Sequence, residues 1–415
     1  MPSVSDLIYS TFPLSIYLPN FSNVQFLPIH LTKAANLRIA YLTSDDPNDK
    51  KSWSGTNYYM LQALKNAGAD THPLGPVHNP LKPFGQVVNK ISRSLMGKRY
   101  NYRHSLLYSK QYARIFKDKL QREGPFDLIF APAASTEIAY LDTDIPIFYT
   151  SDATFRIMHE YYDAFSSVFK SIAGQNEEIE SRALNKASAL TYPSEWAANS
   201  AIHDYGASPE NIHVIPYGAN LDHEPSREEA LESVGLQHSI ELLFVGVDWE
   251  RKGGALAFHV ANELNSMGLN ANLTIIGCNP PLKFQKDFVK VFPYLDKNDP
   301  EQFNLLTELY LNADLFILPT QMECYGIVFC EACAFGLPIL ATNTGGVATI
   351  VKEGENGFLF KPDAKPEDYI DKIVELKEDN SLYMKMRRQA RDRYESSLNW
   401  EHWGQKLISK IKSIL

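Results

Sequence analysis

The sequence predicts an α/β protein built from two successive parallel sheets. Short apolar runs of strand length alternate with amphipathic, helix-like segments along most of the 415 residues, as expected where each strand is followed by a helix that returns the chain to the same edge of a sheet. The pattern restarts after Tyr217, Gly218 and Asn220. We therefore expect two Rossmann-like domains, with the junction near residue 220.

The first half opens as a strand, a glycine loop and a helix. Leu37–Thr43 is an apolar run, and the loop after it leads through Gly55 into the amphipathic segment Thr56–Ala67. Further strands are predicted at 127–131, 145–150, 189–192 and 213–215, and in the second half at 240–245, 273–276, 315–318 and 339–341. Trp400–Leu415 has helical periodicity.

Composition and charge restrict the function classes. The net charge of −9, most of it in the second half, argues against a general nucleic-acid binder, which needs clustered positive charge. No apolar run is long enough to span a bilayer, and the first residues lack the basic start of a secretory signal. We expect a cytoplasmic protein. Its cysteines complete no zinc set and are interpreted as small buried hydrophobic residues: Cys278, Cys324, Cys330 and Cys333.

The segment Pro319–Phe360 carries the strongest chemical signal. Glu323 and Glu331 bracket a turn that contains Gly326, and an apolar run follows. If a helix starts near Tyr325 to Ile327, its first amides and the positive end of its dipole suit a diphosphate above Gly326. Glu331 would then accept hydrogen bonds from a ribose diol, while Glu323 would reach the side where a sugar lies.

These residues also carry a family resemblance. The spacing of Glu323 and Glu331, followed by EACAFGLPILAT, the paired glycines Gly345 and Gly346, and ENGFLF, resembles the signature of retaining glycosyltransferases of family 4. The resemblance implies the GT-B fold: two Rossmann-like domains that face each other across a cleft, with a C-terminal helix that crosses back to the first domain. It also implies a nucleotide-sugar donor and no cofactor.

The resemblance assigns further donor-binding residues. Arg251 and Lys252, in FVGVDWERKGG, match the phosphate-binding loop, although this chain has Val247 where many members carry an arginine. A guanidinium and an ammonium there would neutralise the departing nucleoside diphosphate. Tyr294 and Leu295 lie where the family holds the nucleobase, and Tyr325, Gly326 and Ile327 belong to the donor loop.

The acceptor side is expected in the first domain, because ligands of open α/β sheets lie beyond the carboxyl ends of the strands. Gly55 would let its loop approach the donor diphosphate, and Asp152, after the strand IPIFYT, is either an acceptor-orienting or proton-accepting catalytic group or a helix-capping aspartate. Asp142 and Asp144 form an Asp-x-Asp motif, which we interpret as a turn and not as a metal site. No metal is expected.

The expected organisation is an N-terminal extension at 1–35, an acceptor-binding domain at 36–220, a nucleotide-sugar domain at 221–398 and a returning helix at 399–415. Residues 82–122 form a strongly basic tract with interleaved aromatic residues. Two interpretations stay open: a solvated helix face, or a surface for anionic lipid at the inner face of the cell membrane or for an anionic acceptor.

The sequence thus favours a metal-independent retaining hexosyltransferase. The donor would be a nucleotide diphosphate sugar, with UDP favoured and GDP second, and the acceptor a hydroxyl of a sugar, a lipid-linked sugar or a small molecule. A nucleotide-sugar epimerase and an inactive nucleotide-sugar-binding subunit are the alternatives. Product release would distinguish them, since only transfer frees the nucleoside diphosphate in an acceptor-dependent way.

Overall fold

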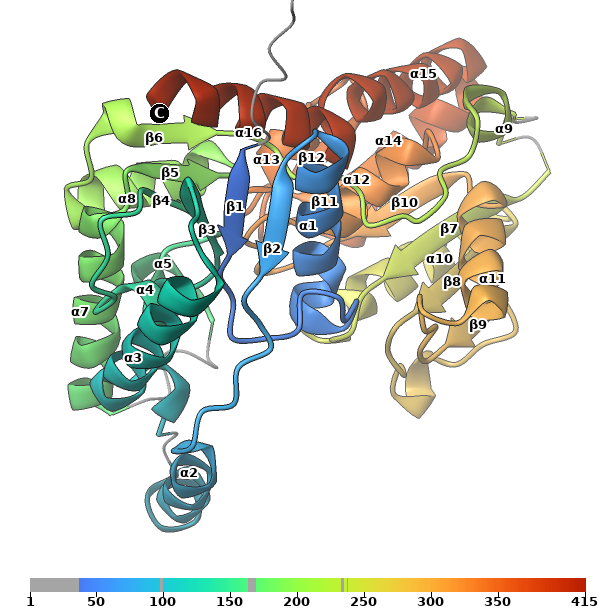
Figure 1. Ribbon diagram of the computed structural model, residues 1–415. Coiled ribbons are helices and arrows are strands. Elements are labelled where there is room, and N and C mark those ends of the chain that lie inside the picture. Colours follow the sequence, from blue (N-terminus) through green and yellow to red (C-terminus); the bar gives the residue numbers. More distant parts are fainter. Residues whose placement is uncertain (1–36, 98–99, 163–168, 233–234, 237) are drawn as a thin grey trace, which may run out of the picture. The chain divides into compact units, whose positions relative to one another are not determined.

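A computed structural model describes residues 37–97, 100–162, 169–232, 235–236 and 238–415. The expected N-terminal extension at 1–35 lies outside the described residues. Within them, the first half of the chain forms a six-stranded parallel sheet in the order β2-β1-β3-β4-β5-β6 (Figure 1). Its strands are β1 (Arg38–Tyr41), β2 (Asp70–Pro73), β3 (Leu128–Pro132), β4 (Ile147–Thr150), β5 (Ala189–Tyr192) and β6 (Ile212–Val214).

The second half forms another six-stranded parallel sheet, in the order β12-β11-β10-β7-β8-β9 (Figure 1). Its strands are β7 (Ile240–Val245), β8 (Ala271–Ile276), β9 (Val289–Phe292), β10 (Leu315–Leu318), β11 (Ile339–Thr342) and β12 (Gly357–Phe360). Two six-stranded parallel sheets in sequence confirm the predicted fold class. The domain limits within the compact unit Leu37–Leu415 stay a prediction.

Helices connect the strands and cover the sheets. Those of the first half are η1 (Ser52–Gly55), α1 (Thr56–Asn66), α2 (Lys82–Met96), η2 (Tyr102–His104), α3 (Leu106–Glu123), α4 (Ser135–Ile138), α5 (Phe155–Tyr161), α7 (Lys170–Lys186), α8 (Glu195–Tyr205) and η3 (Pro209–Asn211). Those of the second half are α9 (Arg227–Leu231), α10 (Gly254–Ser266), η4 (Leu282–Phe284), α11 (Pro300–Leu311), α12 (Ile327–Ala334), α13 (Val347–Ile350), α14 (Pro366–Glu378), α15 (Asn380–Ser397) and α16 (Trp400–Ile414). None of these described helices is long and apolar enough to cross a bilayer.

Each strand predicted from the sequence is present, whereas β2, β9 and β12 are not predicted. All three lie at sheet edges. Asp70 and Pro73 in β2, Lys290 in β9 and Gly357 in β12 weaken the apolar signal. An edge strand is covered on fewer sides than a central one, so it tolerates such residues.

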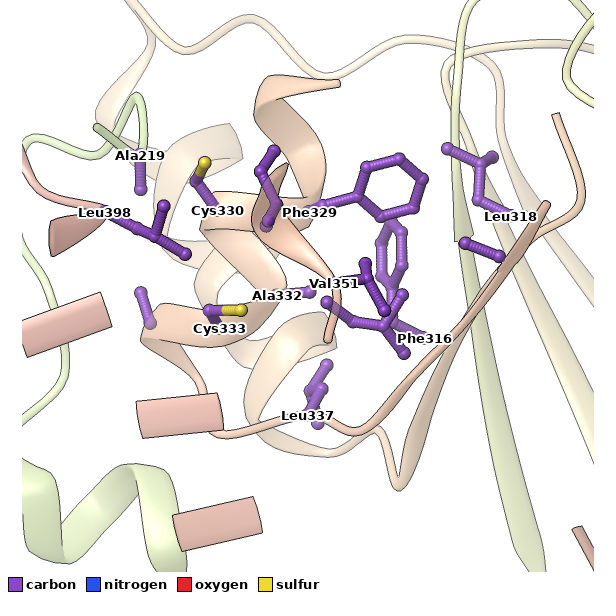
Figure 2. Close-up of a cluster of buried hydrophobic side chains, with 14 of the residues drawn as sticks. Ala219, Phe316, Leu318, Phe329, Cys330, Ala332, Cys333, Leu337, Val351 and Leu398 are labelled. Atoms are coloured by element: carbon purple, nitrogen blue, oxygen red, sulfur yellow. The ribbon is translucent and has the colours of Figure 1, made fainter. Parts of the chain in front are cut away.

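Helix α12 is buried on several sides and therefore lacks an amphipathic pattern. Figure 2 shows Phe316 and Phe329 on one side of it and Cys330, Cys333 and Leu398 on the other. All four cysteines are free and buried, which confirms that they act as small core residues.

The C-terminal helix α16 packs on the first sheet's helix α1, as predicted. The ring of Trp403 contacts Phe130 of β3 at a centroid distance of 5.9 Å. The two chain segments that connect the sheets run side by side, since the amide of Ala219 donates to the carbonyl of Leu398 at 2.9 Å. The helix thus ties the end of the chain to its beginning.

Candidate active site

The site is built on the turn that precedes α12. Gly326 caps this helix with φ of 87°, and no side chain caps it. A Cβ at Gly326 would lie 2.5 Å from Cδ2 of Phe329, so only glycine fits both the backbone angle and the space. The amide of Phe329 donates to the carbonyl of Gly326 at 2.9 Å, so the amides of Ile327 and Val328, at the very start of the helix, are the ones available to a ligand. This confirms the predicted helix start.

A cavity of about 590 Å³ lies at this turn. It is lined by most of the predicted donor-binding residues: Arg251, Lys252, Tyr294, Leu295, Glu323, Gly326, Ile327 and Glu331. Lys50, Lys51 and Ser54, from the loop after β1, complete its wall. Residues from both halves of the chain therefore surround one space.

Two predicted residues contribute differently from the rest. Gly55 lies just behind Ser54 and does not itself line the cavity. The side chain of Tyr325 is buried and donates to the carbonyl of Tyr217 at 2.9 Å, so it anchors the start of α12 to the segment that connects the two sheets. Its phenol does not face the cavity.

Of the two predicted cations, Lys252 pairs with Glu323 and Arg251 contacts the neighbouring backbone. Its carboxylate forms an ion pair with Lys252, and both side chains are largely buried. Arg251 donates to the carbonyl of Met322 at 2.9 Å, next to Glu323 in the chain. Gly246, at the end of β7, packs under Lys252, and a Cβ there would lie 2.9 Å from Cγ of the lysine. The ammonium of Lys252 is thus held against Glu323, whereas Nε of Arg251 lies 3.8 Å from Oδ2 of Asp248.

Glu331 is almost fully buried and has two partners. Nζ of Lys297 lies 2.6 Å from Oε1, and the hydroxyl of Tyr310 donates to Oε2 at 3.1 Å. Lys297 also donates to the carbonyl of Asn220 at 3.0 Å. A carboxylate has about four acceptor positions, so about two remain for a ligand.

Lys297 was not predicted from the sequence. It stands only two residues after Leu295, at the predicted base-binding segment, and its nearness to that segment is the signal that could have indicated it. The neighbouring Asp296 forms an ion pair with Lys51 at 3.2 Å. These contacts tie the loop between β9 and α11 to the first half of the chain.

Tyrosines at the end of α5 hold the loop that carries Glu323. The backbone amide of Glu323 donates to the hydroxyl of Tyr161 at 3.1 Å, and that hydroxyl also bonds to Thr344. The neighbouring Tyr162 lies 3.5 Å from the sulfur of Cys324, with the guanidinium of Arg251 over its ring. Nothing in the sequence around Tyr161 and Tyr162 indicates this role, because the contacts join residues far apart in the chain.

Asp152 follows β4 and stands near Glu323 without lining the cavity. Burial raises the pKa of Asp152 to about 6, the charge of Glu323 adds to the rise, and a hydrogen bond from the Trp53 side chain opposes it. Trp53 and Ser54 have left-handed backbones with φ of 47° and 56°. Three successive left-handed residues, ending at Gly55, thus bring the indole to Asp152.

A second buried acid stands at the same edge of the first sheet. Glu137, in α4 after β3, has its pKa raised to about 7, chiefly because it is buried, and a hydrogen bond with Ser44 opposes the shift. Sequence analysis did not select it, since a lone glutamate in a short helix carries no pattern. Glu137 and Asp152 both lie at the carboxyl ends of strands, where ligands of such sheets bind.

Asp142 of the Asp-x-Asp motif forms a 2.5 Å ion pair with Lys117 and its side chain is exposed. Over the described part of the chain, no group of three or more His, Cys, Asp or Glu side chains is placed to hold a metal ion.

The two facing halves and the cavity at the α12 turn define a GT-B glycosyltransferase fold. Solved structures agree with that class. Sucrose-phosphate synthase from Thermosynechococcus elongatus has a TM-score of 0.66 at 16% identity, with 91% of this chain and 99% of that one covered. A glycosyltransferase from Rickettsia africae has a TM-score of 0.62 at 15% identity, and the match covers 92% of this chain and 99% of that one. Anabaena HepE in complex with UDP has a TM-score of 0.61 at 15% identity, with 91% of this chain and 100% of that one covered.

The chain belongs to glycosyltransferase family 4. A family model described as glycosyl transferases group 1 matches residues 226–393, and one described as glycosyltransferase family 4 matches residues 56–223. Among curated relatives, D-inositol 3-phosphate glycosyltransferase from Corynebacterium efficiens is 27% identical over 51% of this chain and 53% of its own length. The enzyme of that name from Geodermatophilus obscurus is 23% identical over 72% of this chain and 69% of its own length. The chain spans about half the length of the first of these relatives.

Proposed function

We propose that the protein is a retaining hexosyltransferase that moves a sugar from a nucleotide diphosphate donor to a hydroxyl acceptor. One observation carries the proposal: Glu323, Glu331, Lys252 and the start of α12 surround a single cavity. A nucleoside diphosphate sugar is the ligand class that matches these groups: its ribose diol suits Glu331, its diphosphate suits Lys252 and the start of α12, and its sugar suits Glu323. UDP is the favoured nucleotide and GDP the second, and the UDP bound to Anabaena HepE supports that order.

The donor would be held by complementary charge. The amides at the start of α12, Lys252 and Arg251 would bind the diphosphate, and the two free acceptor positions of Glu331 would bind the ribose hydroxyls. Arg251 uses one N–H on Met322 and retains others for phosphate oxygens. As the diphosphate leaves, the same cations would stabilise its growing negative charge without a divalent metal.

Glu323 would face the sugar, where positive charge develops at the anomeric carbon. Its ion pair with Lys252 holds a carboxylate and an ammonium beside each other, an arrangement that would suit the junction of sugar and phosphate. Departure and attack on one face of the sugar would retain the anomeric configuration. The main contributions of the protein are then positioning and electrostatic stabilisation.

The acceptor would lie at the carboxyl edge of the first sheet. Asp152 would orient the acceptor hydroxyl or take its proton, because its raised pKa makes it a better base than an ordinary aspartate. The acceptor class remains a sugar, a lipid-linked sugar or a small molecule. The names of the curated relatives make a phosphorylated cyclitol one acceptor to test.

The proposal is tested by titrating the protein with UDP, GDP and ADP and following thermal unfolding. A ligand at one hundred times its Kd should raise the free energy of unfolding by about 2.7 kcal/mol. Donor turnover is then followed with candidate acceptors, with and without EDTA. Nucleoside diphosphate released only with acceptor, and insensitive to EDTA, supports the proposal. An altered but intact nucleotide sugar means epimerisation, and binding without turnover means a binding subunit. Activity lost with EDTA and restored by manganese would overturn metal independence.

A further inference from the structure

The segment that contains α2 has an unusual charge. Between Asp70 and Asp118 the sequence has no acidic residue and nine Lys or Arg residues. Since the whole chain has a net charge of −9, residues 71–117 carry +9 and the rest of the chain −18. A local concentration of positive charge on an acidic protein indicates a partner with negative charge.

Helix α2 (Lys82–Met96) carries an apolar stripe on its surface. Phe84, Val87, Ile91 and Leu95 follow one another at spacings of three and four residues, which places them on one face of the helix. Each is between 52 and 79% exposed. Exposed large apolar side chains are common singly, but a contiguous stripe of four marks an interaction surface.

A different face of α2 attaches the helix to the protein. Gly85 and Ser92 are buried, and a Cβ at Gly85 would lie 2.5 Å from Cδ2 of Tyr102 in η2. The amide of Tyr100 donates to Oδ1 of Asn89 at 3.0 Å. At 100° per residue, this attachment face is turned by about a quarter circle from the centre of the apolar stripe. The attachment of α2 therefore leaves its stripe open.

The remaining face is basic. Lys82, Lys90 and Arg93 are exposed, and none of them forms an ion pair with a carboxylate among the described residues. The helix thus combines an open apolar stripe with uncompensated positive charge. A nucleic acid would match the charge but not four apolar side chains, and an apolar groove of another protein would not require such a long acid-free segment.

We propose that α2 binds the surface of an anionic bilayer. Its apolar stripe would lie in the boundary between headgroups and acyl chains, and Lys82, Lys90 and Arg93 would lie near the anionic headgroups. This binding concerns a surface outside the candidate active site and holds whether or not the protein transfers hexose.

The test is co-sedimentation of the full chain with vesicles of phosphatidylcholine alone and with about one-third phosphatidylglycerol, at low and high salt. Binding is expected only to the anionic vesicles and to weaken in high salt. Ile91→Ser and Leu95→Ser should each lower the partition coefficient about tenfold, because each removes a membrane-buried side chain. Lys90→Gln and Arg93→Gln should each lower it about fivefold, which corresponds to about 1 kcal/mol per basic residue.

Matched controls are available in the second half of the chain. Leu282→Ser changes a leucine that is 83% exposed, and Lys286→Gln an exposed lysine, and neither should affect vesicle binding. Thermal unfolding and sedimentation velocity confirm that each variant folds and report its oligomeric state. The proposal is overturned if the protein does not bind vesicles, or if the α2 variants and the controls lose vesicle binding equally. It is also overturned if the protein is a dimer that the Leu95→Ser substitution dissociates, because the stripe would then be a contact between copies of the chain.

Discussion

Two glutamates eight residues apart in the chain have different surroundings. Glu323 stands before α12 and is paired with Lys252, whereas Glu331 lies inside the helix and is bound by Lys297 and Tyr310. If the first faces the donor sugar and the second the ribose, their contributions belong to different stages of the reaction. An interaction made mainly in the transition state changes turnover, and one made in the bound state changes affinity.

We therefore predict opposite patterns for two conservative variants. Glu331→Gln should weaken nucleotide binding by roughly 1.5 to 3 kcal/mol, because it removes a charge-assisted acceptor. Glu323→Gln should reduce turnover far more than it weakens binding of the nucleoside diphosphate. Calorimetric titration and turnover measurements check both, with Glu355→Gln, an exposed glutamate, as the control. Equal loss of affinity with unchanged turnover would show that Glu323 has another role.

Asp152 predicts a pH dependence. Its pKa is raised from the ordinary value to about 6, so at pH 7 it is mostly ionised and can accept a proton. Activity should fall about tenfold per pH unit below about 6, and Asp152→Asn should lower turnover and remove this dependence. If activity of the variant still falls at low pH, another group controls that fall; Glu137, whose pKa is raised to about 7, is one candidate.

Protonation of Asp152 affects folding stability in the opposite direction. Between about pH 4 and 6 the folded protein holds the Asp152 proton more tightly than the unfolded chain, so the free energy of unfolding falls as pH rises through that window. Asp152→Asn should flatten this part of the curve, measured by chemical unfolding at several pH values.

At the scale of elements, the site depends on contacts between α5 and the loop before α12. Tyr161 accepts a hydrogen bond from the amide of Glu323 and also bonds to Thr344, so one hydroxyl positions the loop from two sides. Gly345 fits closely there as well, since a Cβ at that position would lie 1.9 Å from the carbonyl oxygen of Glu323. The loop is therefore held by backbone contacts as well as by the ion pair of Glu323 with Lys252.

Tyr161→Phe is predicted to lower turnover several-fold while nucleotide affinity stays unchanged. The substitution removes the hydrogen bonds to Glu323 and Thr344, each worth about 1 kcal/mol. Tyr161 contacts the Glu323 loop but does not line the donor cavity. Steady-state kinetics and nucleotide titration separate the two effects. Tyr192→Phe is the control, because that buried hydroxyl has no partner among the described residues. A matched loss of affinity would mean that Tyr161 supports the whole cavity.

Strands differ in how well they can be predicted. Central strands such as β4 and β10 are buried along their whole length and consist of apolar runs, which the sequence shows directly. The edge strands β2, β9 and β12 are held by a neighbour on one side only, so pairing decides their structure more than composition does.

At the scale of the whole molecule, α16 joins the end of the chain to the first sheet. Gly404 lies in its interior, and a Cβ there would be 2.7 Å from the carbonyl oxygen of Ala63 in α1. Trp400 donates from its indole to Oδ1 of Asn220 at 3.0 Å, where the chain passes between the sheets. Close packing of α16 on α1 therefore determines how firmly the two halves are connected.

Gly404→Ala should destabilise the protein by about 1 to 3 kcal/mol, because the added methyl group forces the helices apart. Gly174→Ala, in α7, meets nothing within 4 Å and should be neutral or stabilise by roughly 0.5 to 1 kcal/mol, since alanine is the better helix former. Thermal unfolding of both variants makes the comparison. Equal stability of the two would contradict close packing at Gly404.

The sequence by itself determined the central strands and the start of α12 at Gly326, with Glu323 before the helix and Glu331 within it, because these follow from local burial and backbone conformation. Only the tertiary structure decided which groups hold those glutamates. Lys252 lies 71 residues from Glu323 in the chain, and Lys297 lies 34 residues from Glu331. Tyr161 lies 162 residues from Glu323, whose backbone amide donates a hydrogen bond to its hydroxyl. No local pattern encodes such pairs, since they form only when the sheets and their connecting segments bring distant residues together.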